Sequence, residues 1–252
     1  MKIGLHCHTA GRSPCACVQP ERIAELYRQA GFDGLMVTDH FISYLFEDYY
    51  PEGSEECKVD FWLDGYRRVK AAGEKLGLCV MLGMELNLAP YNEPGIGYPV
   101  CEFLCCGLTE DFILAHPRLY ELRQEECFEL LDGNGILMYQ AHPFRGRSRP
   151  GSPLFLHGAE VFNANVRHQS HNALAECWVK EFGLIPLAGD DFHQEGDQGR
   201  AWIETQRKVA SAPELAEEIR AGRYEIGLPE AFLSRPPKTV CLTVNREEEH
   251  EP

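Results

Sequence analysis

The chain has 252 residues, of which 44% are hydrophobic and 25% are charged. This composition excludes an intrinsically disordered chain, and no stretch approaches the roughly 20 consecutive apolar residues that span a bilayer. With 39 acidic and 24 basic residues the formal charge is −15, which argues against nucleic acid as a partner because its phosphate backbone repels such a surface.

Strand-like apolar segments alternate with amphipathic helical segments along most of the chain. The strands are predicted at residues 2–5, 35–38, 78–82, 101–106, 136–139, 160–162 and 184–188, and the helices at 20–30, 59–76, 117–131 and 170–182. Pro20 opens the first helix, and glycines such as Gly31, Gly77 and Gly183 follow the helix ends. Seven βα steps indicate an α/β protein whose consecutive parallel strands close into a barrel.

The remaining segments are expected to complete the same domain. A strand at 201–204, a helix at 212–221 and a strand at 224–227 would close and pack the barrel. We therefore expect a single domain over residues 1–235 and an acidic tail over residues 236–252.

Two long loops are predicted at residues 41–58 and 145–156. Each follows a candidate site residue directly, and long loops at the functional end of a rigid scaffold often line the substrate site. We expect these two loops to determine the substrate specificity.

The amino terminus leads directly into a strand and has neither the long apolar region nor the cleavage site of a secretory signal. We therefore expect a cytoplasmic protein without membrane association. In that compartment most of the eleven cysteines are expected to be reduced, and Cys79, Cys105 and Cys106 lie in strand-like segments where thiols are buried. The sequence leaves the oligomeric state open.

Polar residues stand at or beside the ends of nearly all these strands. They are His6, His8, Asp39, His40, Glu85, Glu102, His142, Asn163, Asp191 and His193. Because the strands of such a barrel end at one mouth, we expect these side chains to converge there. Imidazoles with carboxylates suit divalent transition metals, and a carboxylate shared between metals suits hydrolysis.

Two segments have the spacing of chelating pairs. His6 and His8 stand two positions apart, so that on an extended chain both point to the same side and can bind one ion. Asp191 and His193 repeat this spacing, with Asp190 facing the other way. The alternatives are a structural histidine pair in the first case and an acidic turn, with Asp190 as a helix cap, in the second.

Single residues at other strand ends complete the candidate centre. His40 is a candidate ligand with Asp39 as its orienting partner, although Asp39 could instead cap a turn. Glu85 could bridge two metals or be a surface residue, and His142, before Pro143, could be a ligand or a structural residue.

These segments, in this order, resemble the polymerase and histidinol phosphatase (PHP) family over about residues 1–205. The matching motifs are His6-Cys7-His8, Thr38-Asp39-His40, Gly83-Met84-Glu85, Ala141-His142-Pro143 and Asp191-Phe192-His193. The resemblance implies a distorted (β/α)7 TIM-like barrel that holds two or three divalent metal ions and hydrolyses phosphoesters. The imidazole content fits Zn, Mn or Fe as the metal.

The resemblance also implies a ligand set. One metal would bind His6, His8, Glu85 and Asp191, a second would share Glu85 with His142, and a third would bind His40 and His193. Three positions depart from the family pattern: Gly4 stands where many members have an aspartate, Glu102 stands where a histidine often completes the second site, and the stretch Ser13-Pro14-Cys15 lies where the third site often has an aspartate or histidine. Glu102 can bind a metal through oxygen and Cys15 as a thiolate.

The reaction implied is attack on a small phosphate monoester by a metal-activated hydroxide. The arginines that could bind the phosphate are Arg145, Arg147 and Arg12. Asn163 could hydrogen-bond the substrate or only satisfy a turn, and His168 and His171 could protonate the leaving group or be surface residues.

Three other functions fit parts of the sequence. An amidohydrolase-type enzyme would cleave a C–N or C–O bond, but such sites usually use a lysine bridge, and no lysine stands at a strand end. A non-catalytic regulatory protein that binds metal and a phosphorylated ligand would fit the replacements at Gly4 and Glu102. A nuclease or proofreading module is disfavoured by the acidic charge. The expected partner is a small phosphorylated substrate.

Overall fold

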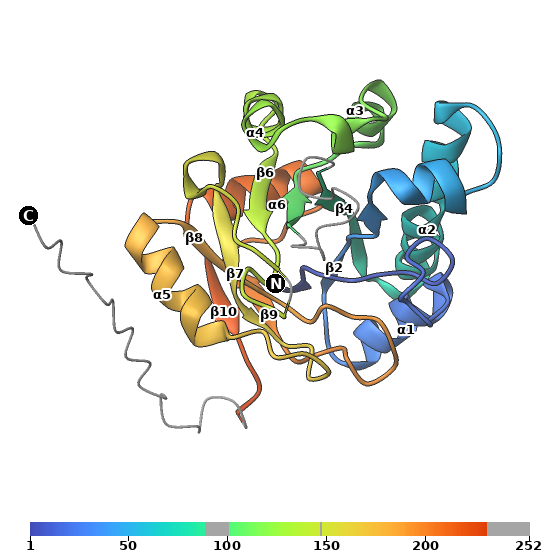
Figure 1. The fold of residues 1–252 in the computed structure, drawn as a ribbon. Helices are drawn as coiled ribbons and strands as arrows, with labels where there is room; N and C mark the ends of the chain where they lie inside the picture. The colour runs from blue at the N-terminus through green and yellow to red at the C-terminus, as the bar shows by residue number, and fades with distance from the viewer. Residues whose placement is uncertain (89–100, 147, 231–252) are drawn as a thin grey trace, which may run out of the picture.

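The structure is a computed structural model that describes residues 1–88, 101–146 and 148–230 (Figure 1). Its strands are β1 (Lys2–Gly4), β2 (Gly34–Val37), β3 (His40–Phe41), β4 (Cys79–Asn87), β5 (Glu102–Cys106), β6 (Leu137–Gln140), β7 (Gly158–Asn163), β8 (Ile185–Gly189), β9 (Trp202–Thr205) and β10 (Tyr224–Gly227). Its helices are α1 (Pro20–Gln29), η1 (Leu45–Tyr49), α2 (Glu55–Leu76), α3 (Glu110–Ala115), η3 (Leu119–Glu121), α4 (Gln124–Gly133), η4 (Pro153–Phe155), α5 (Asn172–Phe182) and α6 (Ala212–Arg220).

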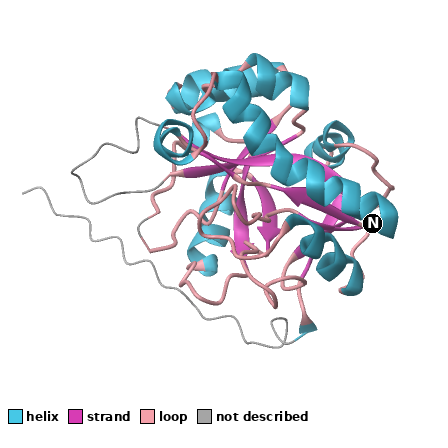
Figure 2. Cartoon of the chain, turned by 90° about the vertical axis from the view of Figure 1, so that its right-hand side faces the viewer, coloured by secondary structure: helices cyan, strands magenta, loops and turns pink. Residues whose placement is uncertain are grey.

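The strands form one curved sheet in the order β10-β9-β1-β2-β4-β5-β6-β7-β8, and β3 also pairs with β4. The segments that follow β1 and β8 meet through a parallel bridge between Cys7 and Phe192, where the Phe192 carbonyl accepts from the His8 amide at 3.0 Å. The strands occupy the centre of the molecule with helices around them (Figure 2). This nearly closed sheet confirms the predicted distorted TIM-like barrel.

The expectation that consecutive strands run parallel is wrong for β5. It pairs antiparallel with both β4 and β6, and β9 and β10 are also antiparallel to their neighbours. Parallel neighbours need a crossover connection, usually a helix. The sequence shows no helical pattern between the strands predicted at 78–82 and 101–106, so β5 runs back along β4.

The ends of several elements also differ from the prediction. Helix α2 begins at Glu55, where the Ser54 hydroxyl accepts from the Cys57 amide at 3.2 Å. Part of the long loop predicted at 41–58 is therefore helix, because this capping serine stands five residues before the expected start. The helix predicted at 117–131 is divided into η3 and α4, and α3 precedes them with Thr109 as its cap.

Alternation along the strands separates the barrel interior from the outer layer. Leu35 and Val37 of β2 pack with α1 and α2, whereas Met36 points inward with Met81 of β4. Alternate residues of β4 share this inward face, so it carries Met81 and, four residues later, Glu85. The inward face of the paired strand β5 carries Leu104 and Glu102. Apolar side chains thus fill the barrel, and acidic ones follow them at the mouth. Because β5 is antiparallel, its beginning rather than its end reaches that mouth.

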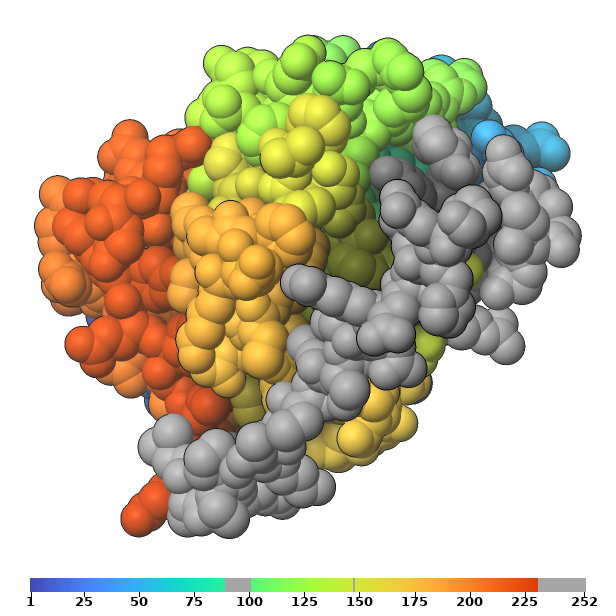
Figure 3. Space-filling model, turned by 60° about the vertical axis from the view of Figure 1, so that its left-hand side comes forward, coloured from blue at the N-terminus to red at the C-terminus, as the bar shows by residue number. Residues whose placement is uncertain are grey.

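On the outside, the segments around α4, α5 and the carboxyl-terminal strands lie next to one another on the face shown in Figure 3. None of the helices formed by the described residues combines the length and apolarity needed to cross a bilayer. The cysteines within the described ranges are free thiols; Cys105 and Cys106 are buried as predicted, and Cys79 is half-buried. Arg147 and the tail predicted at 236–252 lie outside the described residues.

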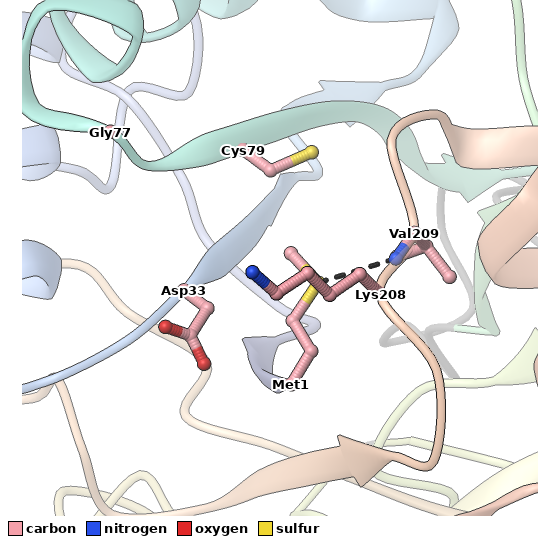
Figure 4. Close-up of a pocket in the computed structure, with 6 residues that line it drawn as sticks. All are labelled: Met1, Asp33, Gly77, Cys79, Lys208 and Val209. Atoms are coloured by element: carbon pink, nitrogen blue, oxygen red, sulfur yellow. Dashed lines mark hydrogen bonds between the residues drawn. The ribbon is translucent and has the colours of Figure 1, made fainter.

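A cavity of about 370 Å³ lies at the other end of the barrel. Asp33 stands directly before β2, and Gly77 and Cys79 stand at the beginning of β4 (Figure 4). Met1 and Val209 face each other there, since the Val209 amide donates to the Met1 sulfur at 3.4 Å. The catalytic candidates are all at the opposite mouth, so this cavity is separate from them.

Candidate metal centre

The structure brings the eight candidate metal ligands into one buried or half-buried cluster at the mouth of the barrel. His6 and His8 follow β1, His40 begins β3, Glu85 lies within β4, Glu102 begins β5, His142 follows β6, and Asp191 and His193 follow β8. Their possible ligand atoms form overlapping groups, within each of which all atoms lie within 4.8 Å of one another. The convergence expected from the strand ends is therefore present in the fold.

The ring of His6 is oriented by a carboxylate. His6 Nδ1 lies 2.9 Å from Glu160 Oε1, and because an ionised carboxylate only accepts, Nδ1 carries the proton and Nε2 keeps a lone pair. Burial lowers the pKa of His6, but the charges of Glu160, Asp191 and Glu85 outweigh it and raise this pKa well above the ordinary value. His6 therefore presents a basic nitrogen to the centre of the cluster.

The ring of His8 is oriented by a hydroxyl. Ser13 Oγ donates to Asp39 Oδ1 at 2.7 Å, and it accepts from the backbone amide of His40 at 3.0 Å. Its remaining lone pair faces His8 Nδ1 at 3.2 Å, so this nitrogen donates and His8 Nε2 keeps its lone pair. The hydroxyl has one proton and two lone pairs, and all three are used.

These two assignments leave a surplus of electron pairs in the centre. His6 Nε2 and His8 Nε2 lie 3.1 Å apart, and each offers a lone pair when its ring is neutral. Glu85 Oε2 lies 3.2 Å from His8 Nε2, and Asp191 Oδ1 lies 3.4 Å from His6 Nε2. Asp191 Oδ1 is buried and has no hydrogen-bond partner among the described residues. With neutral rings, the two imidazole nitrogens and the two carboxylates are all acceptors and cannot hydrogen-bond one another. They fit a divalent cation bound between them.

Glu85 lies between this first group, formed by His6, His8, Glu85 and Asp191, and a second group, formed by Glu85, His142 and Glu102. Its Oε1 is 3.0 Å from His142 Nε2, and Glu102 Oε2 is 3.6 Å from the same nitrogen. Burial raises the pKa of Glu85, but the charges of His6 and His40 outweigh it and lower the pKa well below the ordinary value. Glu85 thus contacts both groups, which is the position that a bridging ligand requires.

Backbone strain accompanies two of the candidate ligands. His142 has a φ of 24° and Asp191 a φ of 51°, both in a region that residues other than glycine rarely adopt. The His142 amide donates to Glu160 Oε2 at 2.9 Å, which holds the turn after β6 in place. Strained residues that are held by surrounding hydrogen bonds are concentrated at functional sites.

A third group contains His8, His40 and His193. His193 Nδ1 faces the Asp191 carbonyl at 2.8 Å, and Cys15 Sγ lies 3.3 Å from His40 Nε2. Burial raises the pKa of the Cys15 thiol, but hydrogen bonds from His193 and His40 outweigh it and lower the pKa to about 5.

Asp39 does not orient His40 as expected. It accepts from the amide and hydroxyl of Thr9 at 2.7 and 2.6 Å and from Ser13, and so it acts on His8 through Ser13. The sequence could not reveal this contact, because the loop after β1 that carries Thr9 and Ser13 reaches Asp39 only in the folded barrel.

The other candidates are spread around the cluster. Arg145 forms an ion pair with Asp191, and its Nη2 lies 3.8 Å from Glu102. Asn163 donates to Glu160 Oε2 at 3.0 Å and has no contact with the candidate ligands among its hydrogen bonds to described residues. His171 is exposed and precedes α5 without capping it through its side chain.

Two buried acids near the centre were missed or misassigned from the sequence. Glu160 lies within β7, and its two oxygens hold His6 and the His142 backbone. The available signal was an acid inside an apolar strand segment, which requires a partner in the core. Asp190 is no helix cap, since it accepts from the amides of Gly199, Arg200 and Ala201 and from a tyrosine hydroxyl.

Removal of the Ser13 hydroxyl is expected to weaken metal binding about 10- to 100-fold, the usual effect of losing a group that orients a ligand. Ser13→Ala leaves His8 Nδ1 without its partner, so the ring can turn or change its protonated nitrogen. The measurement is a zinc titration against a chelating dye. As a matched control, Ser54→Ala removes the α2 cap and costs about 1 kcal/mol of stability, and it should leave zinc affinity unchanged. Equal affinities of the Ser13 variant and the parent protein would contradict the assignment.

Comparison with known proteins supports one family. Residues 169–224, which include α5, β8 and the Asp191 and His193 segment, match the family described as PHP-associated. None of the curated proteins matches the chain.

Solved structures share the fold at low sequence identity. A two-domain protein from Bacteroides vulgatus that contains a predicted PHP-like metal-dependent phosphoesterase matches with a TM-score of 0.61 and 19% identity, over 90% of this chain and 64% of that chain. This chain therefore spans less than two thirds of that protein. PsfC from Pseudomonas syringae matches with a TM-score of 0.60 and 13% identity over 91% of both chains. An amidohydrolase from Chromobacterium violaceum with bound sulfate and no metal matches with a TM-score of 0.53 and 16% identity, over 92% of this chain and 100% of that chain.

The matched segment contains one of the two chelating pairs, and the barrel around it is shared with the PHP-like protein. The chain thus shares its fold with a PHP-like protein, and its segment 169–224 matches the PHP-associated family.

Proposed function

We propose that this protein is a metal-dependent hydrolase that cleaves the phosphoester bond of a small phosphate monoester. The observation that carries the proposal is the pair of imidazole nitrogens 3.1 Å apart, at His6 and His8, with the carboxylates of Glu85 and Asp191 beside them. An arrangement with this surplus of electron pairs is costly to bury without cations, and nitrogen with oxygen donors favours Zn, Mn or Fe. The overlapping groups of ligand atoms provide for two or three ions.

When bound, divalent ions would activate a water molecule as the nucleophile and neutralise charge on the phosphate oxygens. The chain supplies the ligands and holds them rigidly. Glu160 fixes the ring of His6, and Ser13 fixes that of His8. Both devices aim the ligand nitrogens at the same centre, as reactions at several clustered charges require.

Arg145 is the proposed phosphate-binding residue among those described. Its side chain is 19% exposed, so it reaches from the ion pair with Asp191 toward solvent at the mouth. Its guanidinium has more donors than Asp191 uses, and a planar donor group matches phosphate oxygens. Arg145→Lys is expected to raise KM about tenfold, the cost of one weakened charged hydrogen bond. Phosphate release against substrate concentration measures it. The exposed Arg22→Lys serves as the control, and an unchanged KM would exclude the role.

His168 does not supply a proton in this proposal. Burial and the charge of Arg145 lower the pKa of His168 below its ordinary value, so the ring is neutral at pH 7. Substrates whose leaving group needs no proton, such as p-nitrophenyl phosphate, should therefore react most readily. The −15 charge supports a small phosphorylated molecule rather than nucleic acid as the substrate.

The test combines metal content with phosphate release from metal-loaded protein, for a panel of monoesters and nucleotides. The parent protein should release phosphate, and His142→Ala should lose both metal and turnover. Carboxylate esters and amides are included in the panel. Hydrolysis of these without phosphate release would favour an amidohydrolase-type enzyme. Metal binding without any turnover would favour a non-catalytic regulatory protein.

A further inference from the structure

The third group, formed by His8, His40 and His193, differs from the other two in having a thiol beside it. Cys15 Sγ lies 3.3 Å from His40 Nε2, and His193 is a further hydrogen-bond partner of the thiol. No described carboxylate belongs to the group formed by His8, His40 and His193. The Cys15 sulfur is therefore the candidate anionic ligand of this group, whereas the other groups have carboxylate oxygens.

The free nitrogens of this group face Cys15. His193 uses Nδ1 for the Asp191 carbonyl at 2.8 Å, which leaves Nε2 as the donor nitrogen. His40 uses Nδ1 for Glu85 Oε2 at 2.9 Å, which leaves Nε2 on the side of the sulfur. His8 directs its own Nε2 toward His6 and is engaged in the first group.

The observed separation suits two ligands of one ion. With a zinc–sulfur bond of about 2.3 Å and a zinc–nitrogen bond of about 2.0 Å at a tetrahedral angle, the two donors stand about 3.5 Å apart. The observed 3.3 Å between Cys15 Sγ and His40 Nε2 is close to this value. Binding would need no large movement of either side chain.

The loop that carries Cys15 is held in place. The amide of Ala16 donates to the Ser13 carbonyl at 3.0 Å, and the amide of Cys17 donates to the His193 carbonyl at 2.9 Å. The hydroxyl of Tyr50 donates to the carbonyl of Arg12 at 2.8 Å. The position of the thiol is thus set by backbone contacts on both sides, one of them to His193.

We propose that Cys15 is a thiolate ligand that completes a third metal position with His40 and His193, and that this position prefers thiophilic divalent metals. This inference rests on the proposed metal centre but not on the reaction. Imidazole and thiolate together select zinc, cobalt or iron over magnesium and calcium, whereas the carboxylate-rich groups accept harder ions as well. The three positions would therefore differ in metal preference.

Cobalt reports directly on sulfur ligation, because a cobalt–thiolate bond adds a near-ultraviolet charge-transfer absorption to the visible bands of the ion. The full chain is freed of metal and titrated with cobalt chloride under reducing conditions. We expect the charge-transfer band in the parent protein and in Cys17→Ser, whose thiol lies two residues away. Cys15→Ser should lose the band and bind about one equivalent of cobalt less.

A second measurement uses the unmodified protein. Iodoacetamide should alkylate Cys15 in the metal-free protein, and saturating cobalt should abolish this labelling, as read by peptide mass. A charge-transfer band retained in Cys15→Ser, or labelling of Cys15 that cobalt does not slow, would overturn the proposal. Neither readout depends on phosphate release, so a protein that shows the band but hydrolyses no phosphoester would contradict the proposed function alone.

Discussion

Glu85→Gln is expected to lower phosphate release about 10³-fold, because it removes the negative charge shared by the first two groups. The carboxylate lies 3.0 Å from His142 Nε2 and 2.9 Å from His40 Nδ1, and the amide keeps its shape without its charge. A bound metal contributes several kcal/mol to a transition state, which corresponds to roughly three powers of ten in rate. Initial rates with p-nitrophenyl phosphate, together with metal content, measure the effect.

Two variants make this result specific. Glu102→Gln changes a carboxylate that lies 3.6 Å from His142 but belongs to no group with His6. It should lose part of the metal and less activity than Glu85→Gln. Glu176→Gln changes an exposed glutamate that pairs with Lys180 and should behave like the parent protein. If Glu85→Gln kept both its metal and its rate, Glu85 would not be a bridging ligand.

Metal affinity is expected to rise steeply as the pH increases above the ordinary histidine pKa of about 6.5. In the metal-free protein the pKa values of His6 and His40 are raised well above the ordinary value, since nearby carboxylates outweigh the effect of burial. A metal must displace these protons, and each displaced proton changes the affinity about tenfold per pH unit. A chelator competition titration at several pH values gives the slope.

The same pKa shifts make the stability of the metal-free protein depend on pH. Because the pKa values of His6 and His40 are raised by folding, their contribution is complete below the ordinary histidine pKa of about 6.5 and is lost as the pH rises through the raised values. The pKa values of Glu85 and Asp191 are lowered, so their contribution is present above the ordinary carboxyl pKa and is lost as the pH falls through the lowered values.

Metal should consequently raise the melting temperature more at pH 8.5 than at pH 6. At a hundred times the dissociation constant the gain in stability is about 2.7 kcal/mol. His6→Gln removes one of the two histidines whose pKa is raised, and it should flatten the pH dependence of the metal affinity. The exposed His171→Gln should leave this pH dependence unchanged. A metal-induced shift of equal size at both pH values would show that these histidines carry no protons to displace.

The chain order and spacing of the elements were accessible from the sequence. Pro20 and the glycines after the helices mark element ends through backbone preferences that act within a few residues. The candidate ligands could be found in the same way, because polar residues at the ends of buried strands are exceptions to a strong local pattern. That eight of them converge follows from the closure of the barrel.

Only the tertiary structure decided the direction of β5, the partner of Asp39 and the position of Cys15. Strand direction depends on which neighbour a strand pairs with, and hydrogen bonds such as Ser13 to Asp39 join segments that approach only when the barrel closes. The role of Glu160 is of the same kind, since a carboxylate in a strand acquires a function only from the rings beside it. Local sequence determines which side chains are available, and long-range packing determines which of them meet.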